Sequence, residues 1–278
     1  MIKTIALPSG RSIPVLGLGT WMMGDQAKNR QNEIAALKHG LDLGITLIDT
    51  AEMYAEGEAE RVIAEAIHDR RDSTFLVSKV YPHNASRQGV IAACERSLNR
   101  LKTDYLDLYL LHWRGSIPLS ETLEAFQTLQ QAGKIRDYGV SNFDKADMQE
   151  AIDLPGGTAI ATNQVLYNLM RRGIEWDLRP WCREHHIPIM AYSPVEQGRL
   201  LKNQQLQSIA QQIGVTPAQV AIAWLLHQDN VIVIPKSSTI AHVEQNRAAF
   251  DLQLSPETLH QLDAIFPPPQ KPVALEML

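Results

Sequence analysis

The stretch from residue 106 to 113, Leu106-Asp107-Leu108-Tyr109-Leu110-Leu111-His112-Trp113, decides the fold class of this chain. Most of its first six residues are apolar, and a polar histidine follows where the run ends. Such a short apolar run is typical of a parallel strand covered by helices, because half-exposed antiparallel strands alternate more clearly. Together with 106–111, similar runs predict strands at 15–20, 46–50, 75–80, 136–141, 160–164, 188–192 and 231–235.

The segments between these strands carry apolar residues at helical spacing. They predict helices at 34–43, 59–68, 90–101, 119–132, 217–226 and 256–265, and Thr216 and Pro217 mark one start as N-cap and first helical residue. Alternating strands and helices imply right-handed βαβ units in an α/β protein. Eight such units match a single (β/α)8 TIM barrel in number and total length. An open doubly wound sheet is the competing architecture.

Two features concern the ends and the extent of the fold. Pro8-Ser9-Gly10 is a turn cluster between Ile5-Ala6-Leu7 and Ser12-Ile13-Pro14, which predicts an N-terminal β-hairpin. No low-complexity linker divides the chain, and Pro267-Pro268-Pro269 follows the last helical pattern. We therefore expect one domain over residues 1–278.

Composition limits the function classes. The 278 residues are 45% hydrophobic and 21% charged, and the net charge of −5 lacks the basic excess of a nucleic-acid binder. No signal peptide and no apolar window of membrane-spanning length is found, so we expect a soluble cytoplasmic protein without a membrane partner. Cys94 and Cys182 form no CxxC pair, which predicts packing roles in a reducing compartment and no metal site.

Four polar residues stand at or just after the ends of predicted strands, where catalytic side chains of such barrels lie. They are Asp49, Tyr54, Lys79 and His112. Each alone has a plain structural explanation, such as a helix cap or a core histidine. Together they are costly to bury unless they are paired, so their joint presence at one end of the barrel predicts a catalytic site.

The chain resembles the aldo-keto reductases in eight motifs that occur in the family's order. They are Gly17-Leu18-Gly19-Thr20-Trp21, Asp49-Thr50-Ala51-Glu52-Met53-Tyr54, Val77-Ser78-Lys79-Val80, Asp104 to Trp113, Gly139-Val140-Ser141-Asn142-Phe143, Asn163-Gln164-Val165, Ala191-Tyr192-Ser193-Pro194 and Ile234-Pro235-Lys236-Ser237. The resemblance covers nearly the whole chain. It implies that the hairpin closes the bottom of the barrel, and within the family the chain is most similar to bacterial reductases of methylglyoxal, 2,5-diketogluconate and other reactive carbonyls.

The resemblance implies a catalytic role for each of the four residues. Tyr54 is the general acid that protonates a carbonyl oxygen while a nicotinamide delivers hydride to the carbon. A phenol has a pKa near 10, so it needs a nearby cation to stabilise its phenolate, and Lys79 is that cation. Asp49 keeps Lys79 charged and oriented, whereas His112 orients the carbonyl or helps relay a proton.

The cofactor implied by the resemblance is NADPH. No GxGxxG follows the first strand, which argues for a dinucleotide lying across the barrel mouth. Ser141, Asn142 and Gln164 then bind the carboxamide, Tyr192 stacks on the ring, and Lys236, Ser237 and Ser238 bind the 2′-phosphate. The full cofactor set is Gly19, Thr20, Trp21, Asp49, Ser141, Asn142, Gln164, Tyr192, Ser193, Pro194, Gly198, Arg199, Leu200, Lys236, Ser237, Ser238, His242, Gln245 and Asn246. His242 replaces the usual arginine beside that phosphate, which leaves NADH use open.

Substrate contacts are expected from residues just beyond the strand ends, namely Trp21, Met22, Met53, Tyr81, His112 and Trp113. They would form an apolar cup for a small carbonyl compound. Arg114 stands where a proline is common, and we interpret it as a solvated charge rather than a contact to anionic substrates. We expect a monomer.

Two other function classes remain as alternatives. Some family members are nucleotide-binding auxiliary subunits with little turnover, but the intact set of four residues favours catalysis. A metal-dependent barrel hydrolase would use His83, His185 and His186. His185 and His186 are neighbours in a predicted helical stretch, 181–186, so their side chains diverge and do not easily share an ion.

Overall fold

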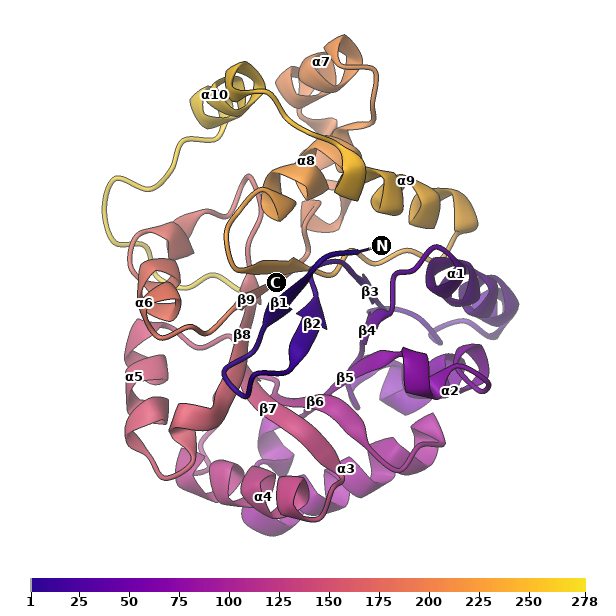
Figure 1. Ribbon diagram of the computed structural model, residues 1–278, viewed down its shortest axis with the longest axis vertical. Coiled ribbons are helices and arrows are strands. Elements are labelled where there is room, and N and C mark those ends of the chain that lie inside the picture. The colour runs from indigo at the N-terminus through magenta and orange to yellow at the C-terminus, as the bar shows by residue number, and fades with distance from the viewer. Residues whose placement is uncertain (1) are drawn as a thin grey trace.

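The computed structural model describes residues 2–278 and contains a barrel of parallel strands ringed by helices (Figure 1). Eight strands follow one another in chain order, each pairing with the next in parallel. They are β3 (Gly17–Gly19), β4 (Leu47–Asp49), β5 (Phe75–Val80), β6 (Leu106–Leu111), β7 (Ile135–Ser141), β8 (Ile160–Leu166), β9 (Ile189–Tyr192) and β10 (Val231–Val233). The prediction of a (β/α)8 barrel is confirmed, and the open sheet is excluded.

The barrel closes between its first and last strands. Leu16 bridges to Val233 and Gly19 to Lys236, both in parallel. A Cβ on Gly19 would lie 2.8 Å from the carbonyl oxygen of Ile234, so only glycine allows this close approach. Closure brings the end of β3 beside the segment that follows β10.

The α-helices lie outside the barrel (Figure 1). Within residues 2–278 they are α1 (Arg30–Asp42), α2 (Glu58–Ala66), α3 (Arg87–Leu101), α4 (Leu119–Gln131), α5 (Lys145–Asp153), α6 (Leu178–Glu184), α7 (Gln204–Gln212), α8 (Pro217–Leu226), α9 (Ile240–Asp251) and α10 (Pro256–Ile265). Short 3-10 helices at Ala27–Asn29, Tyr54–Gly57, Arg71–Ser73, Pro82–Asn84, Gly157–Ala159, Gly173–Glu175, Glu196–Gly198 and Leu200–Lys202 lie in the connections.

An antiparallel hairpin, β1 (Thr4–Ala6) with β2 (Ser12–Pro14), closes the N-terminal end of the barrel. Leu7 and Ile13 pack into the barrel interior together with Leu47 and Leu108. Gly10 adopts the left-handed φ of +83° that the turn requires. The predicted hairpin and its position are therefore confirmed.

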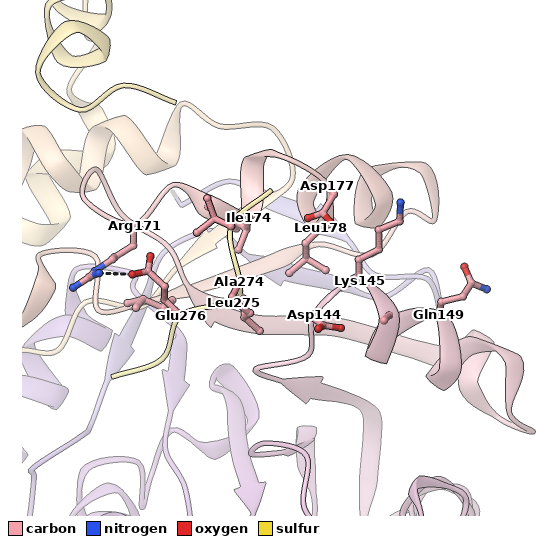
Figure 2. Close-up of a pocket in the computed structure, with 14 residues that line it drawn as sticks. Asp144, Lys145, Gln149, Arg171, Ile174, Asp177, Leu178, Ala274, Leu275 and Glu276 are labelled. Carbon is pink, nitrogen blue, oxygen red and sulfur yellow. Dashed lines mark hydrogen bonds and ion pairs between the residues drawn. The ribbon is translucent and has the colours of Figure 1, made fainter. Parts of the chain in front are cut away.

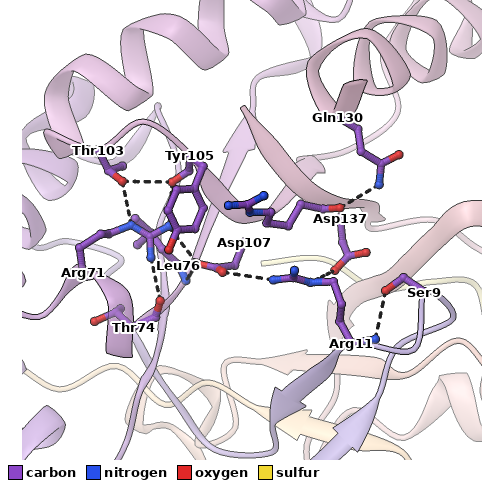
Figure 3. A network of polar contacts seen from close by, with 11 residues as sticks. Ser9, Arg11, Arg71, Thr74, Leu76, Thr103, Tyr105, Asp107, Gln130 and Asp137 are labelled. Carbon is purple, nitrogen blue, oxygen red and sulfur yellow. Dashed lines mark hydrogen bonds and ion pairs between the residues drawn. The ribbon is translucent and has the colours of Figure 1, made fainter. Parts of the chain in front are cut away.

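A polar network fastens the hairpin to the strands (Figure 3). Arg11 pairs with Asp107 at 3.5 Å and with Asp137 at 3.0 Å, near the beginnings of β6 and β7. Arg71 reaches Asp107 at 2.9 Å, and its guanidinium lies 3.9 Å from the ring centre of Tyr105. These contacts lie at the end of the barrel opposite the carboxyl ends of the strands.

Element bounds differ from the predicted ones where pairing, rather than local pattern, sets them. Strands β5 and β6 and helices α8 and α10 have the predicted bounds. β10 ends at Val233, two residues early, and Pro235 has no N–H to donate to a ladder. β8 extends two residues further, because Leu166 still pairs with Tyr192. α6 ends at Glu184, so His185 is its C-cap and His186, with φ of +56°, lies beyond it.

No single helix among the described residues is long and apolar enough to cross a membrane. Helices α7 and α8 have the length and apolar composition of a membrane span only when taken together, and the two helices are bent by 85° at the break between them. The apolar residues of α8 are buried in the fold.

Candidate active site

A buried chain of hydrogen bonds joins three of the four predicted residues at the carboxyl ends of β4 and β5. The Lys79 ammonium lies 2.8 Å from Asp49 Oδ2, 2.7 Å from the Thr50 carbonyl oxygen and 3.4 Å from the Tyr54 hydroxyl. Lys79 is fully buried and Asp49 nearly so. Tyr54 begins the short helix that follows β4, which brings its phenol back over Lys79.

The charge states of Asp49, Lys79 and Tyr54 depend on one another. Burial acts to lower the pKa of Lys79, but Asp49 and Tyr54 outweigh it, so the pKa lies above its ordinary value and the ammonium keeps its proton. Burial raises the pKa of Tyr54, while the Lys79 charge opposes that increase. From the sequence, only the lowering effect of Lys79 on the pKa of Tyr54 was expected. The net result is a phenol that stays protonated at neutral pH and can therefore donate a proton.

His112 completes the set from the end of β6. Its ring centre lies 5.8 Å from that of Tyr54 in an edge-to-face arrangement. Burial, with a smaller contribution from the Lys79 charge, lowers the pKa of His112 to about 2, so the imidazole is neutral. Its buried Nδ1 has no hydrogen-bond partner among residues 2–278. A neutral histidine here can orient a polar group without repelling Lys79.

The residues predicted to bind a nicotinamide lie beside this chain. Gln164 donates from Nε2 to Asp49 Oδ1 at 2.8 Å. The Tyr192 hydroxyl donates to Asn142 Oδ1 at 3.0 Å, and Asn142 Nδ2 donates to the His112 carbonyl and to Ser141 Oγ, both at 3.1 Å. These contacts join the end of β7 to the ends of β6 and β9, and the end of β8 to that of β4, next to the four catalytic candidates.

The loop after β9 has an unusual backbone. Ser193, Glu196 and Gln197 have φ between +50° and +53°, and Gly198 has φ of +86°. Several left-handed residues in succession turn backbone N–H groups to one side, which suits a phosphate group. Pro194 and Leu200 are buried, whereas the predicted phosphate contact Arg199 is 52% exposed.

Glu196 in this loop was not predicted from the sequence. It is fully buried and accepts from Asn168 at 2.8 Å, Arg171 at 3.0 Å and Arg199 at 3.3 Å. The sequence does not indicate this role of Glu196, because two of its partners, Asn168 and Arg171, lie more than twenty residues away in the chain. A carboxylate is also unexpected in a loop predicted to bind an anion. Arg199 thus has a partner within the protein.

The segment after β10 gathers the residues predicted around an adenosine 2′-phosphate. Lys236 is exposed and donates to Ser238 Oγ at 3.3 Å. The N-terminus of α9 follows, with Thr239 as N-cap accepting from the His242 N–H. Gln245 is half-buried and Asn246 buried on the same helix. A free lysine, hydroxyl groups and a helix N-terminus are donors that fit a phosphate.

The predicted substrate residues line the rim of the mouth. Trp21, Met22 and Met53 are exposed by 43%, 51% and 38%. The Trp113 ring lies 4.9 Å from the rings of both Tyr81 and His112. Thr20, also in the predicted cofactor set, is buried and donates to the Asp49 carbonyl at 2.9 Å.

Glu52 is a second residue that the sequence argument missed. It accepts from the Tyr81 N–H at 2.9 Å and from Asn84 at 3.0 Å, and it pairs with Arg96. It therefore ties the loop that carries Tyr54 to the loop that carries Tyr81. The contact joins loops from two strands, so spacing along the chain does not reveal it.

Arg114, interpreted above as a solvated charge, takes part in ion pairs at the surface. Its guanidinium pairs with Glu150 at 2.7 Å and Asp147 at 3.2 Å, both on α5. Arg114 thereby fastens the loop after β6 to this helix while its side chain remains 32% exposed.

The three histidines considered as metal ligands, His83, His185 and His186, do not come together as one group within residues 2–278. His185 stacks on Trp181 with ring centres 3.8 Å apart, and His83 contacts Tyr81. Across residues 2–278 there is no group of three or more His, Cys, Asp or Glu side chains arranged to hold a metal ion.

Comparisons with known proteins agree with this arrangement. Residues 15–266 match the Aldo/keto reductase family. The chain is 53% identical to the methylglyoxal reductase YeaE of Escherichia coli K12 over 281 residues, which cover 99% of both proteins. It is 34% identical to a glyoxal reductase of Bacillus subtilis, covering 94% of this chain and 92% of that protein. A crystal structure of an aldo/keto reductase from Klebsiella pneumoniae in complex with NADP and acetate superposes with a TM-score of 0.97 at 51% identity, with 100% of each chain covered.

Proposed function

Because this chain belongs to the aldo/keto reductase family, we propose that it is an NADPH-dependent reductase of small aldehydes and ketones, with methylglyoxal-like reactive carbonyls as substrates. The observation that carries the proposal is the buried Asp49–Lys79–Tyr54 chain beside a neutral His112. A reduced nicotinamide, when bound, supplies the hydride that the carbonyl carbon accepts.

The remaining chemistry belongs to side chains of this protein. Tyr54 donates its phenolic proton to the carbonyl oxygen as negative charge develops there. Lys79 lies 3.4 Å from the phenol oxygen and stabilises the phenolate that remains. Asp49 keeps Lys79 in its ammonium form and in this position, and neutral His112 donates a hydrogen bond that orients the substrate oxygen.

Electrostatics keep the proposed acid in the protonated form that reduction requires. The pKa of Tyr54 is raised by burial, so the acid is already protonated at neutral pH. The pKa of His112 is too low for it to compete as a cation for the same role. The assignment of a proton donor and a neutral orienting group therefore follows from the burial of both residues.

The residues proposed to hold NADPH form a continuous path along the mouth. Ser141, Asn142, Gln164 and Tyr192 hold the nicotinamide, and the loop 193–200 holds the pyrophosphate. Lys236, Ser237 and Ser238 bind the 2′-phosphate at the N-terminus of α9. An exposed His242 in the first turn of α9 offers at most one hydrogen bond there, so we propose NADPH preference with weaker use of NADH.

The substrate is proposed to lie between Tyr54, His112 and the aromatic rim formed by Tyr81 and Trp113. The relatives reported above are named for the reduction of methylglyoxal and glyoxal, which supports compact dicarbonyl substrates. We further propose a monomer that acts in the cytoplasm. The two free cysteines, Cys94 and Cys182, are buried, as expected of a reducing compartment.

The alternative of an auxiliary nucleotide-binding subunit is less well supported. The relatives at highest identity reported above are reductases by name, and the residues needed for proton transfer are in contact with one another. Tight nucleotide binding without turnover would return weight to this alternative.

The test is a spectrophotometric assay of NADPH oxidation by the purified protein with methylglyoxal, glyoxal and 4-nitrobenzaldehyde, run in parallel with NADH. We expect oxidation with all three carbonyls and faster turnover with NADPH. Light scattering of the same sample measures the mass and tests the proposed monomer. Absence of turnover with every carbonyl, while NADPH still binds, would contradict the reductase proposal.

A further inference from the structure

The C-terminal tail runs along the wall of the barrel mouth without close packing. After α10 it passes α6 and ends near the barrel axis in the view of Figure 1. A cavity of about 350 Å³ lies between tail residues 273–276 and the helices α5 and α6 (Figure 2). Val273 and Met277 are exposed by 42% and 50%, and Leu275 is the tail side chain that packs against the core. Apolar burial therefore holds this tail only weakly.

Arg171 connects the tail to the loop that follows β9. Its Nε donates to Glu196 Oε1 at 3.0 Å, and its Nη1 contacts Glu276 of the tail (Figure 2). Glu196 is fully buried and is fixed further by Asn168. Arg171 thus binds the rigidly held carboxylate of Glu196 on one side and Glu276 of the weakly packed tail on the other.

The end of the tail also reaches the predicted nicotinamide site. Burial raises the pKa of Tyr192 to about 12, and a hydrogen bond with the Leu278 backbone opposes that increase; the Tyr192 hydroxyl also donates to Asn142 at 3.0 Å. The tail therefore connects to two parts of the proposed dinucleotide site. Glu276 connects to the loop 193–200 through Arg171, and Leu278 connects to Tyr192.

We propose that Arg171 is a positioning residue that couples the C-terminal tail to the dinucleotide-binding loop. A dinucleotide on the loop 193–200 stabilises the arrangement in which the buried Glu196 holds Arg171 and Arg171 holds Glu276 and the tail at the mouth. This inference rests on the proposed function for the assignment of that loop to NADPH. Because coupling between two sites is reciprocal, a tail that NADPH holds more firmly must in turn strengthen NADPH binding, so loosening the tail must weaken that binding.

The test uses Glu276→Gln, which removes the tail's charge and leaves the buried Arg171–Glu196 pair intact. The matched control is Glu257→Gln, an exposed glutamate on α10 that makes no ion pair within residues 2–278. The first readout is the NADPH dissociation constant, which is measured by quenching of tryptophan fluorescence. We expect Glu276→Gln to weaken binding by about fivefold, and the control to match the wild type.

The second readout is independent of catalysis and measures the tail directly. Carboxypeptidase releases Leu278 and Met277, and mass spectrometry follows the rate with and without NADPH. We expect NADPH to slow release severalfold in the wild type and in Glu257→Gln, but little in Glu276→Gln. Equal NADPH affinity and equal protection in Glu276→Gln and wild type would overturn the inference and leave the proposed function intact.

The two proposals fail in different ways. Tail protection by NADPH in a wild-type protein that reduces no carbonyl compound would contradict the reductase function and support the coupling. Failure of the wild type to bind NADPH would overturn both.

Discussion

Gln164 donates a hydrogen bond of 2.8 Å to Asp49, so a residue of the proposed nicotinamide site also orients the carboxylate that holds Lys79. The four side chains Gln164, Asp49, Lys79 and Tyr54 thus form one continuous chain across three strands and a loop. Gln164 therefore has two proposed roles: it binds the carboxamide of the cofactor, and through Asp49 and Lys79 it helps to orient the proton donor Tyr54.

Replacing Gln164 by Leu should therefore impair both functions. The change leaves Asp49 Oδ1 buried without its donor, which costs about 1–3 kcal/mol in a site of this kind. We expect kcat to fall about tenfold and the KM for NADPH to rise. Steady-state kinetics with methylglyoxal measure both, and a loss in the KM for NADPH alone would mean that the contact with Asp49 does not matter for catalysis.

Removing the phenol of Tyr54 should abolish reduction. Tyr54→Phe takes away the proton donor and little of the binding surface, so the NADPH dissociation constant should change less than about twofold while kcat falls at least about 100-fold. A stopped-flow measurement of single turnover checks the chemical step. Retention of a tenth of the wild-type kcat would identify another group as the acid.

Lys236 should distinguish the two dinucleotides. It is exposed near the N-terminus of α9, where a 2′-phosphate would add charge-assisted hydrogen bonds. We expect Lys236→Ala to weaken NADPH binding about tenfold and NADH binding by less than twofold. Fluorescence titration with each nucleotide gives both constants. Equal losses would place the 2′-phosphate elsewhere.

His112 should contribute to loss of stability in acid. Its folded pKa of about 2 lies far below its unfolded value near 6.5, so the unfolded chain binds the extra proton as the pH falls. Stability is therefore full above pH of about 6.5 and decreases below it by up to about 1.4 kcal/mol per pH unit from this residue.

The corresponding variant is His112→Gln, with the exposed His260→Gln as control. Urea unfolding at several pH values should show a shallower acid slope for His112→Gln than for the wild type and the control. Parallel slopes in all three proteins would mean that His112 is solvated enough to protonate in the folded state.

A buried ion pair away from the mouth should support stability. Arg100 lies 2.5 Å from Glu60, which is fully buried and also accepts from Ser78 at 2.8 Å. Arg100→Met leaves this carboxylate unpaired, so we expect the free energy of unfolding to fall by about 3 kcal/mol. Adding Glu60→Gln should restore part of it. If Arg100→Met alone is as stable as the wild type, water must hydrogen-bond to the Glu60 carboxylate in place of the arginine.

The local pattern of the sequence was sufficient for elements whose ends carry their own signals. Helix α8 begins after Thr216 with Pro217 first, and α10 begins after Ser255 with Pro256 first, and in both the N-cap hydroxyl accepts from the third residue. Strands β5 and β6 are mostly apolar runs ended by loops. Their limits depend on residues within a few positions, so the sequence alone predicts them.

α9 was not predicted because it has only a narrow buried face. Val243, Asn246 and Ala249 are its buried residues, which is too little apolar periodicity to stand out. Its place on the barrel is set by contacts with α8 and with α1, which lies near the opposite end of the chain.

The sequence by itself determined the barrel, the order of its strands and the candidate residues Asp49, Tyr54, Lys79 and His112, because strand ends in a parallel barrel must share one face. Only the tertiary structure decided how these groups are charged and which neighbours hold them. Burial makes His112 neutral and keeps Tyr54 protonated, and distant partners bring Arg171, Glu196 and Glu276 together. Desolvation and contacts across the chain depend on three-dimensional packing, which spacing along a sequence does not encode.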